Sequence, residues 1–253
     1  MKTISIINHK GGVGKTTSAA NIGSGLCRLG KKVLLIDLDP QANLSINFGI
    51  NPQTERQSVY DALSGRCDLP ILQLDKLGRE MPDIVPSSLD LSVAEMELNN
   101  EPGREFILRR LIEKVRFLYD YILIDCPPSL GLLTLNAISA SQSAIIPVEL
   151  SNFSLVGMTK LFNVIEKVHD RINPELNHRH ILVTRTDKRQ AVHRELSEYL
   201  RERHADVFET EIRSNVKILE SQFKQMDIFT YDKRSNAATD YMNVCRQFIK
   251  FYP

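Results

Sequence analysis

A glycine-rich segment between a short apolar run and a helical pattern constrains this chain more than any other feature. Residues 8–17 read Asn-His-Lys-Gly-Gly-Val-Gly-Lys-Thr-Thr. The run at 4–8 predicts a strand and the pattern at 16–29 predicts a helix, for which Gly30 suits the C-terminal cap. Glycines let successive backbone N–H groups turn inward as an anion-binding nest, and the helix adds the positive end of its dipole. The segment therefore predicts a phosphate-binding loop.

Two side chains of this loop have the chemistry that nucleotide binding requires. In the standard pattern G-x-x-x-x-G-K-[ST], the lysine, here Lys15, contacts the β- and γ-phosphates, and the hydroxyl after it, here Thr16, ligates Mg²⁺. The chain departs from that pattern because His9 replaces the first glycine and a second lysine, Lys10, precedes the Gly-Gly pair. A glycine-rich turn without a ligand is the alternative, but the strand and the helix around the loop argue against it. The residues of this loop expected to bind nucleotide are Lys10, Gly11, Gly12, Val13, Gly14, Lys15, Thr16 and Thr17.

Apolar strand patterns alternate with helical patterns along the whole chain. Continuous apolar runs, typical of strands covered on both faces, occur at 33–36, 121–125, 144–148 and 181–184. Helical patterns occur at 103–117, 131–140, 153–171, 190–204 and 235–252, whereas 50–100 is less periodic and should hold short elements. Such alternation predicts βαβ units. We expect one domain over residues 1–253, an α/β P-loop NTPase fold with a mostly parallel twisted sheet and helices on both faces.

Composition excludes several other classes of protein. With 42% hydrophobic and 25% charged residues, the chain is typical of globular proteins that bury a large core without disulfides or a structural metal. The four cysteines form no C-x-x-C pair, which indicates reduced thiols in a cytoplasmic protein. We expect no signal peptide before the loop, and no apolar run approaches the ~18 residues of a membrane span. A net charge of +1 does not by itself indicate a polyanionic partner.

Three aspartates follow predicted strands, at the sheet edge where the loop is expected to lie. The strand at 33–36 leads into Asp37 and Asp39, and the strand at 121–125 ends on Asp125. Phosphoryl transfer depends on charge neutralisation and an oriented water, so carboxylates linked to a metal are expected at this edge. A single aspartate at a strand end is more often a cap or a turn residue. Three of them beside a phosphate loop favour a catalytic magnesium site.

These patterns together resemble the ParA/Soj-type partition ATPases, within a larger group that also contains MinD-type ATPases and the nitrogenase iron protein. The resemblance covers nearly the whole chain. Its marks are the loop at 10–17, Asp-Leu-Asp-Pro-Gln at 37–41, Tyr-Ile-Leu-Ile-Asp-Cys-Pro-Pro-Ser at 121–129, and the segment 212–231. The resemblance implies hydrolysis of ATP with Mg²⁺ in a homodimer that sandwiches the nucleotides on ATP binding.

The resemblance also implies a role for each site residue. Lys10 would reach across the dimer to the partner subunit's phosphates, Asp39 would position the attacking water, and Asp125 would hold the metal through water. Segment 127–129 resembles a switch that senses the γ-phosphate, with a rigid exit from the strand as the alternative. The candidate catalytic residues are Lys10, Lys15 and Asp39. The candidate metal-binding residues are Thr16, Asp37 and Asp125.

The motif that holds the base departs from the family's pattern. The family reads Ile-Pro-Arg-Asn-Val-Arg where this chain reads Ile-Arg-Ser-Asn-Val-Lys over 212–217. Asn215 matches and is expected to bind nucleotide. Arg213 replaces the proline and Ser214 replaces the first arginine, so the packing around adenine should differ from the family's.

Members of this family that bind DNA without sequence preference use basic residues at two positions, occupied here by Arg189 and Lys217. Phosphate contacts need only correctly placed cations, so lysine can replace arginine. A solvated charged surface is the alternative. The neighbours that would widen the patch are Arg185, Arg194, Arg213, Lys224, Lys233 and Arg234. With nine residues ahead of Lys10, we expect no N-terminal helix-turn-helix domain, and DNA affinity should come from doubling a weak patch on dimerisation.

The resemblance therefore implies a cytoplasmic, nucleoid-associated ATPase that partitions DNA, released on hydrolysis that a ParB-like partner stimulates. A MinD-like role at a membrane is the alternative and would need a basic amphipathic C-terminal helix. Segment 247–252 has too few cations for that, so we interpret it as core packing and expect no membrane partner. Electron transfer, as in the nitrogenase iron protein, would need paired cluster cysteines, whereas Cys126 is more simply a core thiol.

Overall fold

The chain folds around one six-stranded parallel sheet. The structure is a computed structural model that describes residues 1–74, 80–187 and 189–253, without the side chains of 152–156. In the sheet, the strand order is β3-β2-β4-β1-β5-β6, and every pairing between these strands is parallel. The strands are β1 (Lys2–Ile6), β2 (Val33–Asp37), β3 (Asp83–Val85), β4 (Tyr121–Asp125), β5 (Ser143–Glu149) and β6 (His178–Thr184). The expected α/β class with a parallel sheet is confirmed.

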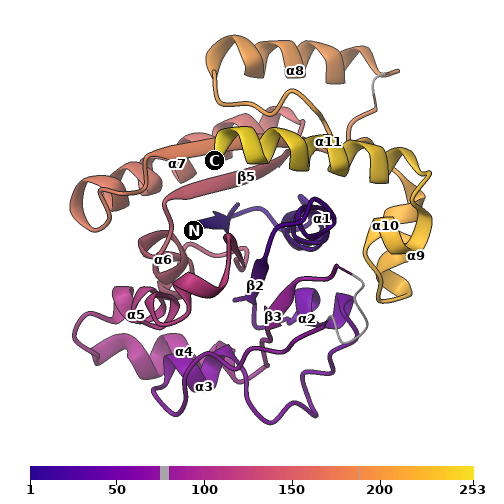
Figure 1. Cartoon of the computed structure of the whole chain (residues 1–253). Helices are drawn as coiled ribbons and strands as arrows, with labels where there is room; N and C mark the ends of the chain where they lie inside the picture. Colours follow the sequence, from indigo (N-terminus) through magenta and orange to yellow (C-terminus); the bar gives the residue numbers. More distant parts are fainter. Residues whose placement is uncertain (75–79, 188) are drawn as a thin grey trace.

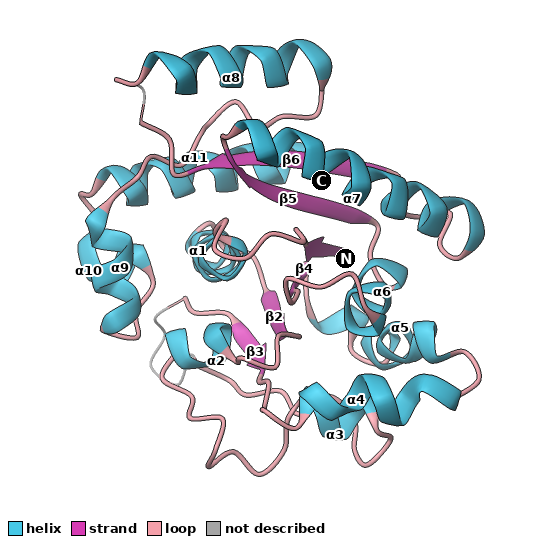
Figure 2. Cartoon of the chain, turned by 180° about the vertical axis from the view of Figure 1, so that it is seen from behind, coloured by secondary structure: helices cyan, strands magenta, loops and turns pink. Residues whose placement is uncertain are grey.

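Helices cover both faces of this sheet (Figures 1 and 2). Neighbouring residues of a strand point to opposite faces, and β2 illustrates this: Leu34 and Ile36 pack with α3–α7, whereas Val33 and Leu35 pack with α1, α10 and α11. Helix α8 lies at the edge of the molecule beyond β6 (Figure 2). The helices are α1 (Lys15–Arg28), α2 (Asn43–Asn47), α3 (Val59–Leu63), α4 (Leu91–Glu97), α5 (Ile107–Glu113), α6 (Leu132–Ser139), α7 (Asn152–Arg171), α8 (Ala191–Arg203), α9 (Val216–Phe223), α10 (Ile228–Asp232) and α11 (Asn236–Phe251).

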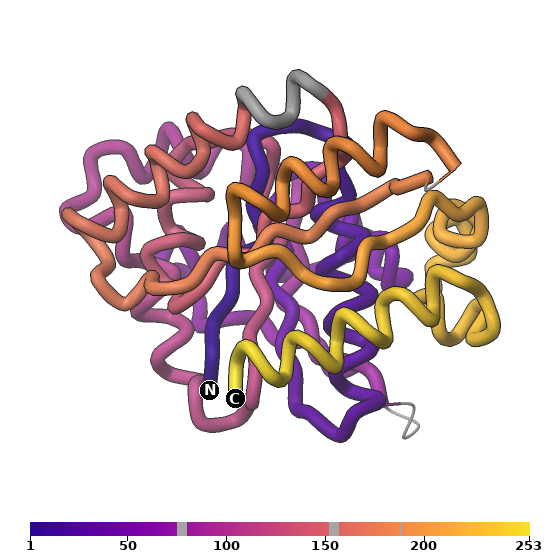
Figure 3. Tube along the Cα trace, turned by 90° about the horizontal axis from the view of Figure 1, so that it is seen from above, coloured from indigo at the N-terminus to yellow at the C-terminus, as the bar shows by residue number. Residues whose placement is uncertain are grey.

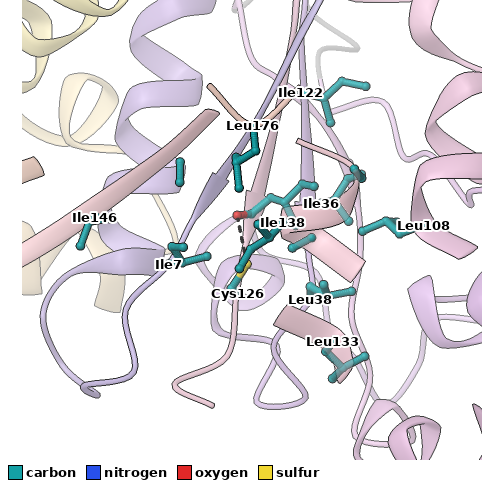
Figure 4. Packing of buried hydrophobic residues seen from close by; sticks show 14 of the residues in the cluster. Ile7, Ile36, Leu38, Leu108, Ile122, Cys126, Leu133, Ile138, Ile146 and Leu176 are labelled. Carbon is teal, nitrogen blue, oxygen red and sulfur yellow. Dashed lines mark hydrogen bonds between the residues drawn. The ribbon is translucent and has the colours of Figure 1, made fainter. Parts of the chain in front are cut away.

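The core on the α3–α7 face reaches the end of β4. Figure 4 shows Cys126 among Ile7, Ile36 and Ile138, with its Sγ directed at the Ile124 carbonyl 3.8 Å away. Burial is the largest influence on this thiol and raises the pKa of Cys126 well above its ordinary value, so the side chain stays neutral. All four cysteines are free thiols. Cys126 is therefore a core thiol, as expected.

The region expected as one helix over 103–117 is instead three short pieces: a 3₁₀ turn at Arg104–Phe106, helix α5, and a second turn at Arg116–Leu118. Asn136 of α6 provides a physical reason for the irregular start. Its side chain donates to the Arg104 carbonyl at 2.8 Å and accepts from the Leu108 amide at 3.1 Å. Tertiary contacts thus satisfy backbone groups that a continuous helix would pair with each other.

The C-terminal helix α11 is part of the core. Its Tyr241, Val244 and Phe248 are buried against α1 and the sheet, and Tyr252 after it is 1% exposed. Tyr121, at the start of β4, donates its hydroxyl hydrogen to the Tyr252 carbonyl at 2.6 Å, and because β4 pairs with β1 the C-terminus lies near the N-terminus (Figure 3). The interpretation of 247–252 as core packing is confirmed. Among the described residues, no helix combines the length and the apolarity that a bilayer span requires.

Candidate nucleotide site

The backbone conformation of the loop between β1 and α1 is set by side-chain contacts at its start and by left-handed glycines near its end. Asn8 donates its amide to the Pro147 carbonyl at 2.7 Å and accepts from the Lys10 amide at 3.0 Å, which turns the chain out of the sheet. Gly12 and Gly14 have φ of 75° and 88°, a region that side chains disfavour. A loop with this backbone presents N–H groups to an anion, as the glycine pattern predicts.

Lys15 is the first residue of α1 and is 7% exposed. Its ammonium donates to the Lys10 carbonyl at 3.2 Å, so it lies across the loop. Burial lowers the pKa of Lys15, and the carboxylates of Asp125 and Asp39 oppose that shift. A buried cation with one neutral acceptor suits an anionic ligand, because phosphate oxygens would provide stronger, charge-assisted hydrogen bonds. Lys10 itself is exposed.

The ends of β1, β2 and β4 bring Asp125 to the loop. In the register of the sheet, Asp125 pairs with Ile6 on one side and with Asp37 on the other. Asp125 is fully buried, and within the described residues no donor forms a hydrogen bond of good geometry with either carboxylate oxygen, although the Thr16 hydroxyl lies close by. Burial and the nearby Asp37 raise the pKa of Asp125 well above its ordinary value, while the Thr16 hydroxyl and Lys15 oppose this. A buried carboxyl group without a well-formed hydrogen bond is costly unless a ligand or water completes it.

Asp37 and Asp39 shape the segment that follows β2. Asp37 accepts from the Ser45 amide at 2.8 Å, the Ser45 hydroxyl at 2.7 Å and the Asp39 amide at 3.2 Å. Burial raises the pKa of Asp37 to about 6, although these hydrogen bonds oppose the rise. Asp39 is 8% exposed and accepts from the Gln41 amide at 2.9 Å. The backbone contacts of Asp37 therefore fix where Asp39 lies.

The three aspartates do not form a ready-made metal cage. Within the described ranges, no group of three histidine, cysteine or acidic side chains converges as a cation site. Mg²⁺ does not require one, because it usually keeps several waters and takes one or two protein ligands together with phosphate oxygens. Asp125, which lies near the Thr16 hydroxyl and lacks a well-formed hydrogen bond among the described residues, fits that mode of binding. Asp37, whose oxygens already accept three hydrogen bonds, fits a supporting position better than a direct ligand.

A cavity of about 320 Å³ opens beside the loop, toward α9. Gly12, Gly14 and Thr17 line one side of it, and Asn215 and Leu219 line the other. Asn215 is the N-cap of α9: its side-chain oxygen accepts from the Lys217 amide at 2.9 Å, which leaves the amide nitrogen for a ligand. A larger cavity of about 830 Å³ lies between α3 and α5 and contains none of the predicted site residues. The smaller cavity is the one that continues the phosphate loop.

Arg213 and Ser214, the two departures from the family's base motif, both line this cavity. The Arg213 backbone N–H, which a proline would lack, donates to Asp240 at 3.1 Å. Its guanidinium donates to the same carboxylate from Nε at 2.9 Å and from Nη2 at 2.7 Å. Arg213 therefore connects this segment to α11 through its side chain, whereas the proline of the family's motif would restrict the backbone through its ring.

Two residues of the site have no signal in the sequence pattern. Thr184, at the end of β6, donates to the Val13 carbonyl at 2.9 Å and braces the loop from outside. Gln222 of α9 donates to the Thr17 hydroxyl at 2.9 Å. Both join segments far apart in the chain, so no local motif could identify them.

The two predicted DNA-binding cations lie on the surface, outside the nucleotide cavity, and each has a carboxylate partner. Arg189 is 91% exposed at its side chain and binds Asp187 at 3.0 Å, which lowers the pKa of Asp187 to about 2. Lys217, on α9, binds Glu220 at 2.8 Å, and Tyr231 donates to the same Glu220 oxygen at 2.7 Å. Five further cations of the proposed patch are exposed: Arg185, which pairs with Glu149 at 3.7 Å, and Arg194, Lys224, Lys233 and Arg234.

Comparisons with known proteins place this geometry in a family. The family described as "AAA domain" matches residues 1–178. The sporulation initiation inhibitor protein Soj of Bacillus subtilis is 39% identical over 251 residues, covering 97% of each chain. The chromosome partitioning protein ParA of Caulobacter vibrioides is 35% identical over 254 residues, covering 98% of this chain and 94% of the relative. The chain belongs to the ParA/Soj family of partition ATPases. The resemblance inferred from the motifs is thereby confirmed, and the chain is an ATPase.

A solved structure shows nucleotide bound to the same fold. Cobyrinic acid a,c-diamide synthase from Mycobacterium smegmatis, with bound ADP and magnesium, is 29% identical to this ParA/Soj protein, has a TM-score of 0.86, and covers 100% of this chain and 95% of its own. A second structure of that protein holds an ATP analogue and magnesium. Related chains of this fold therefore bind adenine nucleotides together with magnesium.

Proposed function

We propose that this ParA/Soj ATPase partitions DNA: MgATP joins two subunits into a sandwich dimer, the dimer binds DNA without sequence preference, and hydrolysis releases it. A ParB-like partner would stimulate hydrolysis, and the protein would act in the cytoplasm on the nucleoid. The observation that carries the nucleotide part is the fully buried Asp125, which lacks a well-formed hydrogen bond among the described residues, beside a glycine loop that already holds a buried lysine. Family membership supports the rest.

Different parts of the nucleotide would bind to the loop and to the adjoining cavity. The backbone of residues 10–14 and the Lys15 ammonium would bind the phosphates, with Thr17 beside them, and Asn215 and the walls of the 320 Å³ cavity would bind the nucleoside. Thr16 and Asp125 would hold magnesium, the latter through water, with Asp37 in support. The metal would neutralise charge on the transferred phosphoryl group. Asp39, fixed by the Asp37 contacts, would position the attacking water.

DNA binding would depend on doubling a weak surface. Arg189 and Lys217 each face a carboxylate in the monomer, so one subunit offers little free positive charge at these two positions. An ATP-dependent dimer presents two copies, and the second contact gains from the effective concentration set by the first. The affinity for DNA should therefore depend on which nucleotide is bound.

The test is DNA binding measured with no nucleotide, with ADP and with MgATP at low salt. We expect tight binding to any duplex with MgATP alone. Equal binding in the three states would contradict coupling between nucleotide and DNA. Binding to anionic vesicles with ATP, together with no binding to DNA, would instead support a MinD-like role at a membrane.

Lys10→Ala is expected to bind one ATP with wild-type affinity but not to form the ATP-dependent dimer. The reason is that the Lys10 side chain is exposed in the monomer, and its proposed phosphate partner belongs to the other subunit. Sedimentation velocity with and without ATP measures this, with Lys32→Ala as an exposed lysine away from the loop. A normal ATP-dependent dimer in Lys10→Ala would exclude the cross-subunit role.

Glu220→Gln is expected to strengthen DNA binding by the ATP dimer about two- to fivefold at low salt, in line with the modest strength of exposed ion pairs. The substitution frees Lys217 from its carboxylate and removes a negative charge from the DNA-facing surface. The matched control is Asp68→Asn, which frees Lys114 from an exposed pair at 2.6 Å near α5. Weaker DNA binding by Glu220→Gln would place Lys217 outside the DNA contact.

A further inference from the structure

The segment that leaves Asp125 is held at its far end by a helix from elsewhere in the chain. Residues 126–131 connect β4 to α6, and the Cys126 amide donates to the Ile6 carbonyl at 3.3 Å, at the start of the phosphate loop. Pro127 and Pro128 lack N–H donors and have fixed φ, so they can neither anchor the segment nor absorb a shift. Its position therefore depends on its two ends.

The contacts of this segment lead into α6. Thr134 donates its hydroxyl hydrogen to the Ser129 carbonyl at 2.6 Å, and the Leu135 amide donates to the Gly131 carbonyl at 3.0 Å. These contacts join the segment to the first turn of α6. Whatever fixes that turn also fixes residues 127–131.

Glu95 of α4 holds the first turn of α6 in place. The N-cap of α6 is Gly131, which has no side chain to accept from the free amides of the first turn. Glu95 Oε1 accepts from the Leu133 amide at 3.2 Å, and the carboxylate lies so close that a Cβ at Gly131 would overlap it. The negative charge also suits the positive end of the α6 dipole. Helices α4 and α6 share the same side of the sheet (Figure 2).

We propose that Glu95 is a positioning residue for ATP hydrolysis: it caps α6 from another helix and thereby holds segment 127–131 in one place beside Asp125. This inference rests on the proposed nucleotide site. Among the described residues, the hydrogen bond of Glu95 is to the first turn of α6 and not to the phosphate loop, so it acts through the segment on the chemical step and leaves nucleotide binding alone. The stiffness of the two prolines transmits any displacement of the cap toward Asp125.

The chain offers two independent ways to break the contact and one way to keep it. Glu95→Ala removes the acceptor. Gly131→Ala displaces the carboxylate by its Cβ, and because Gly131 has φ of −82°, alanine adopts the same backbone without strain. Glu95→Gln retains a side-chain oxygen that accepts from Leu133. The matched control is Glu97→Ala, which removes a carboxylate of the same helix that accepts from the Tyr60 hydroxyl at 2.9 Å.

Steady-state ATP hydrolysis, ADP affinity and thermal unfolding of the full chain test the proposal. We expect Glu95→Ala and Gly131→Ala to lower kcat about five- to tenfold, because this is the rate change that results when the free energy of one lost helix cap is added to the activation barrier. KM and the Kd of ADP should stay near wild type. Glu95→Gln and Glu97→Ala should keep kcat within about twofold of the wild type.

Three results would overturn the proposal. They are an unchanged kcat in Glu95→Ala, an equal loss in Glu95→Gln, or an equal loss in Glu97→Ala, which would indicate general loosening of α4. If Glu95→Ala does not fold, Gly131→Ala alone decides, because it leaves every α4 side chain in place. Failure of the nucleotide site itself has a separate signature: Lys15→Ala would bind ADP as well as the wild type does.

Discussion

Lys15→Ala is expected to weaken ATP binding about 100-fold, because a charge-assisted contact to phosphate contributes up to about 3 kcal/mol. Lys15 is 7% exposed, and its ammonium already lies across the loop on the Lys10 carbonyl. Titration of the protein with a fluorescent ATP analogue in the presence of Mg²⁺ measures the loss.

The second lysine of the loop supplies the control. Lys10→Ala removes a cation four residues from Gly14 but leaves the backbone contacts of Asn8 and the buried ammonium in place. Titration should therefore separate the two variants, with Lys10→Ala binding one ATP as the wild type does. Comparable ATP affinity in Lys15→Ala would move the phosphates away from this loop and would remove the basis of the proposed site.

Features that depend on neighbouring residues were predictable from the sequence. The observed strand β4 has the bounds expected from its apolar run, and β2 differs by one residue, because strands buried on both faces need continuous apolar runs. Helix α1 starts at Lys15 and ends one residue before its expected end, with Gly30 at φ of 79° as the cap pattern requires. The turn into the phosphate loop follows from its glycines for the same local reason.

Features that depend on distant residues were not predictable. Strand β3 has three residues and forms because Leu34 to Ile36 offer it a parallel edge. The break in 103–117 follows from Asn136, and the loop is braced by Thr184 from β6. Each contact joins positions whose spacing in the sequence carries no period, so only the folded chain reveals it.

The partner of each DNA-binding cation illustrates the same limit. Arg189 and Lys217 were identified by their positions in the family's pattern, which concerns the cations alone. Asp187 and Glu220 become relevant only when the structure places them 3.0 and 2.8 Å from those cations. Their proximity leaves these two positions nearly neutral in one subunit, so the basic patch of one subunit is weaker than the two cations alone suggest. It also makes dimerisation more important for DNA affinity than the cations alone suggest.

Replacing both Arg189 and Lys217 by glutamate is expected to lower DNA binding of the ATP-bound dimer at least about 100-fold at low salt, because phosphate contacts are electrostatic and each lost cation also reduces counterion release. The new carboxylates would lie beside Asp187 and Glu220, so each position changes from neutral to doubly negative. Basal ATP turnover and dimerisation should persist, since neither side chain belongs to the proposed phosphate or metal site. A glutamate at 217 also lies in the first turn of α9, where the helix dipole favours it.

The control for this charge reversal is Lys114→Glu with Arg116→Glu. Both are exposed, ion-paired cations at the end of α5, on the opposite side of the molecule from α9 in Figure 1. The control changes net charge equally, so it separates a local DNA contact from a general effect of protein charge. For the wild type, the logarithm of the association constant should fall by about 0.9 per neutralised phosphate for each tenfold rise in salt, and this slope should shrink when either cation is replaced singly by glutamine. If the control loses as much DNA affinity as the Arg189 and Lys217 double variant, binding is a property of overall charge and the assigned surface is wrong. Loss confined to the double variant, together with normal ATP turnover, would locate the DNA contact at α9 and at the loop after β6.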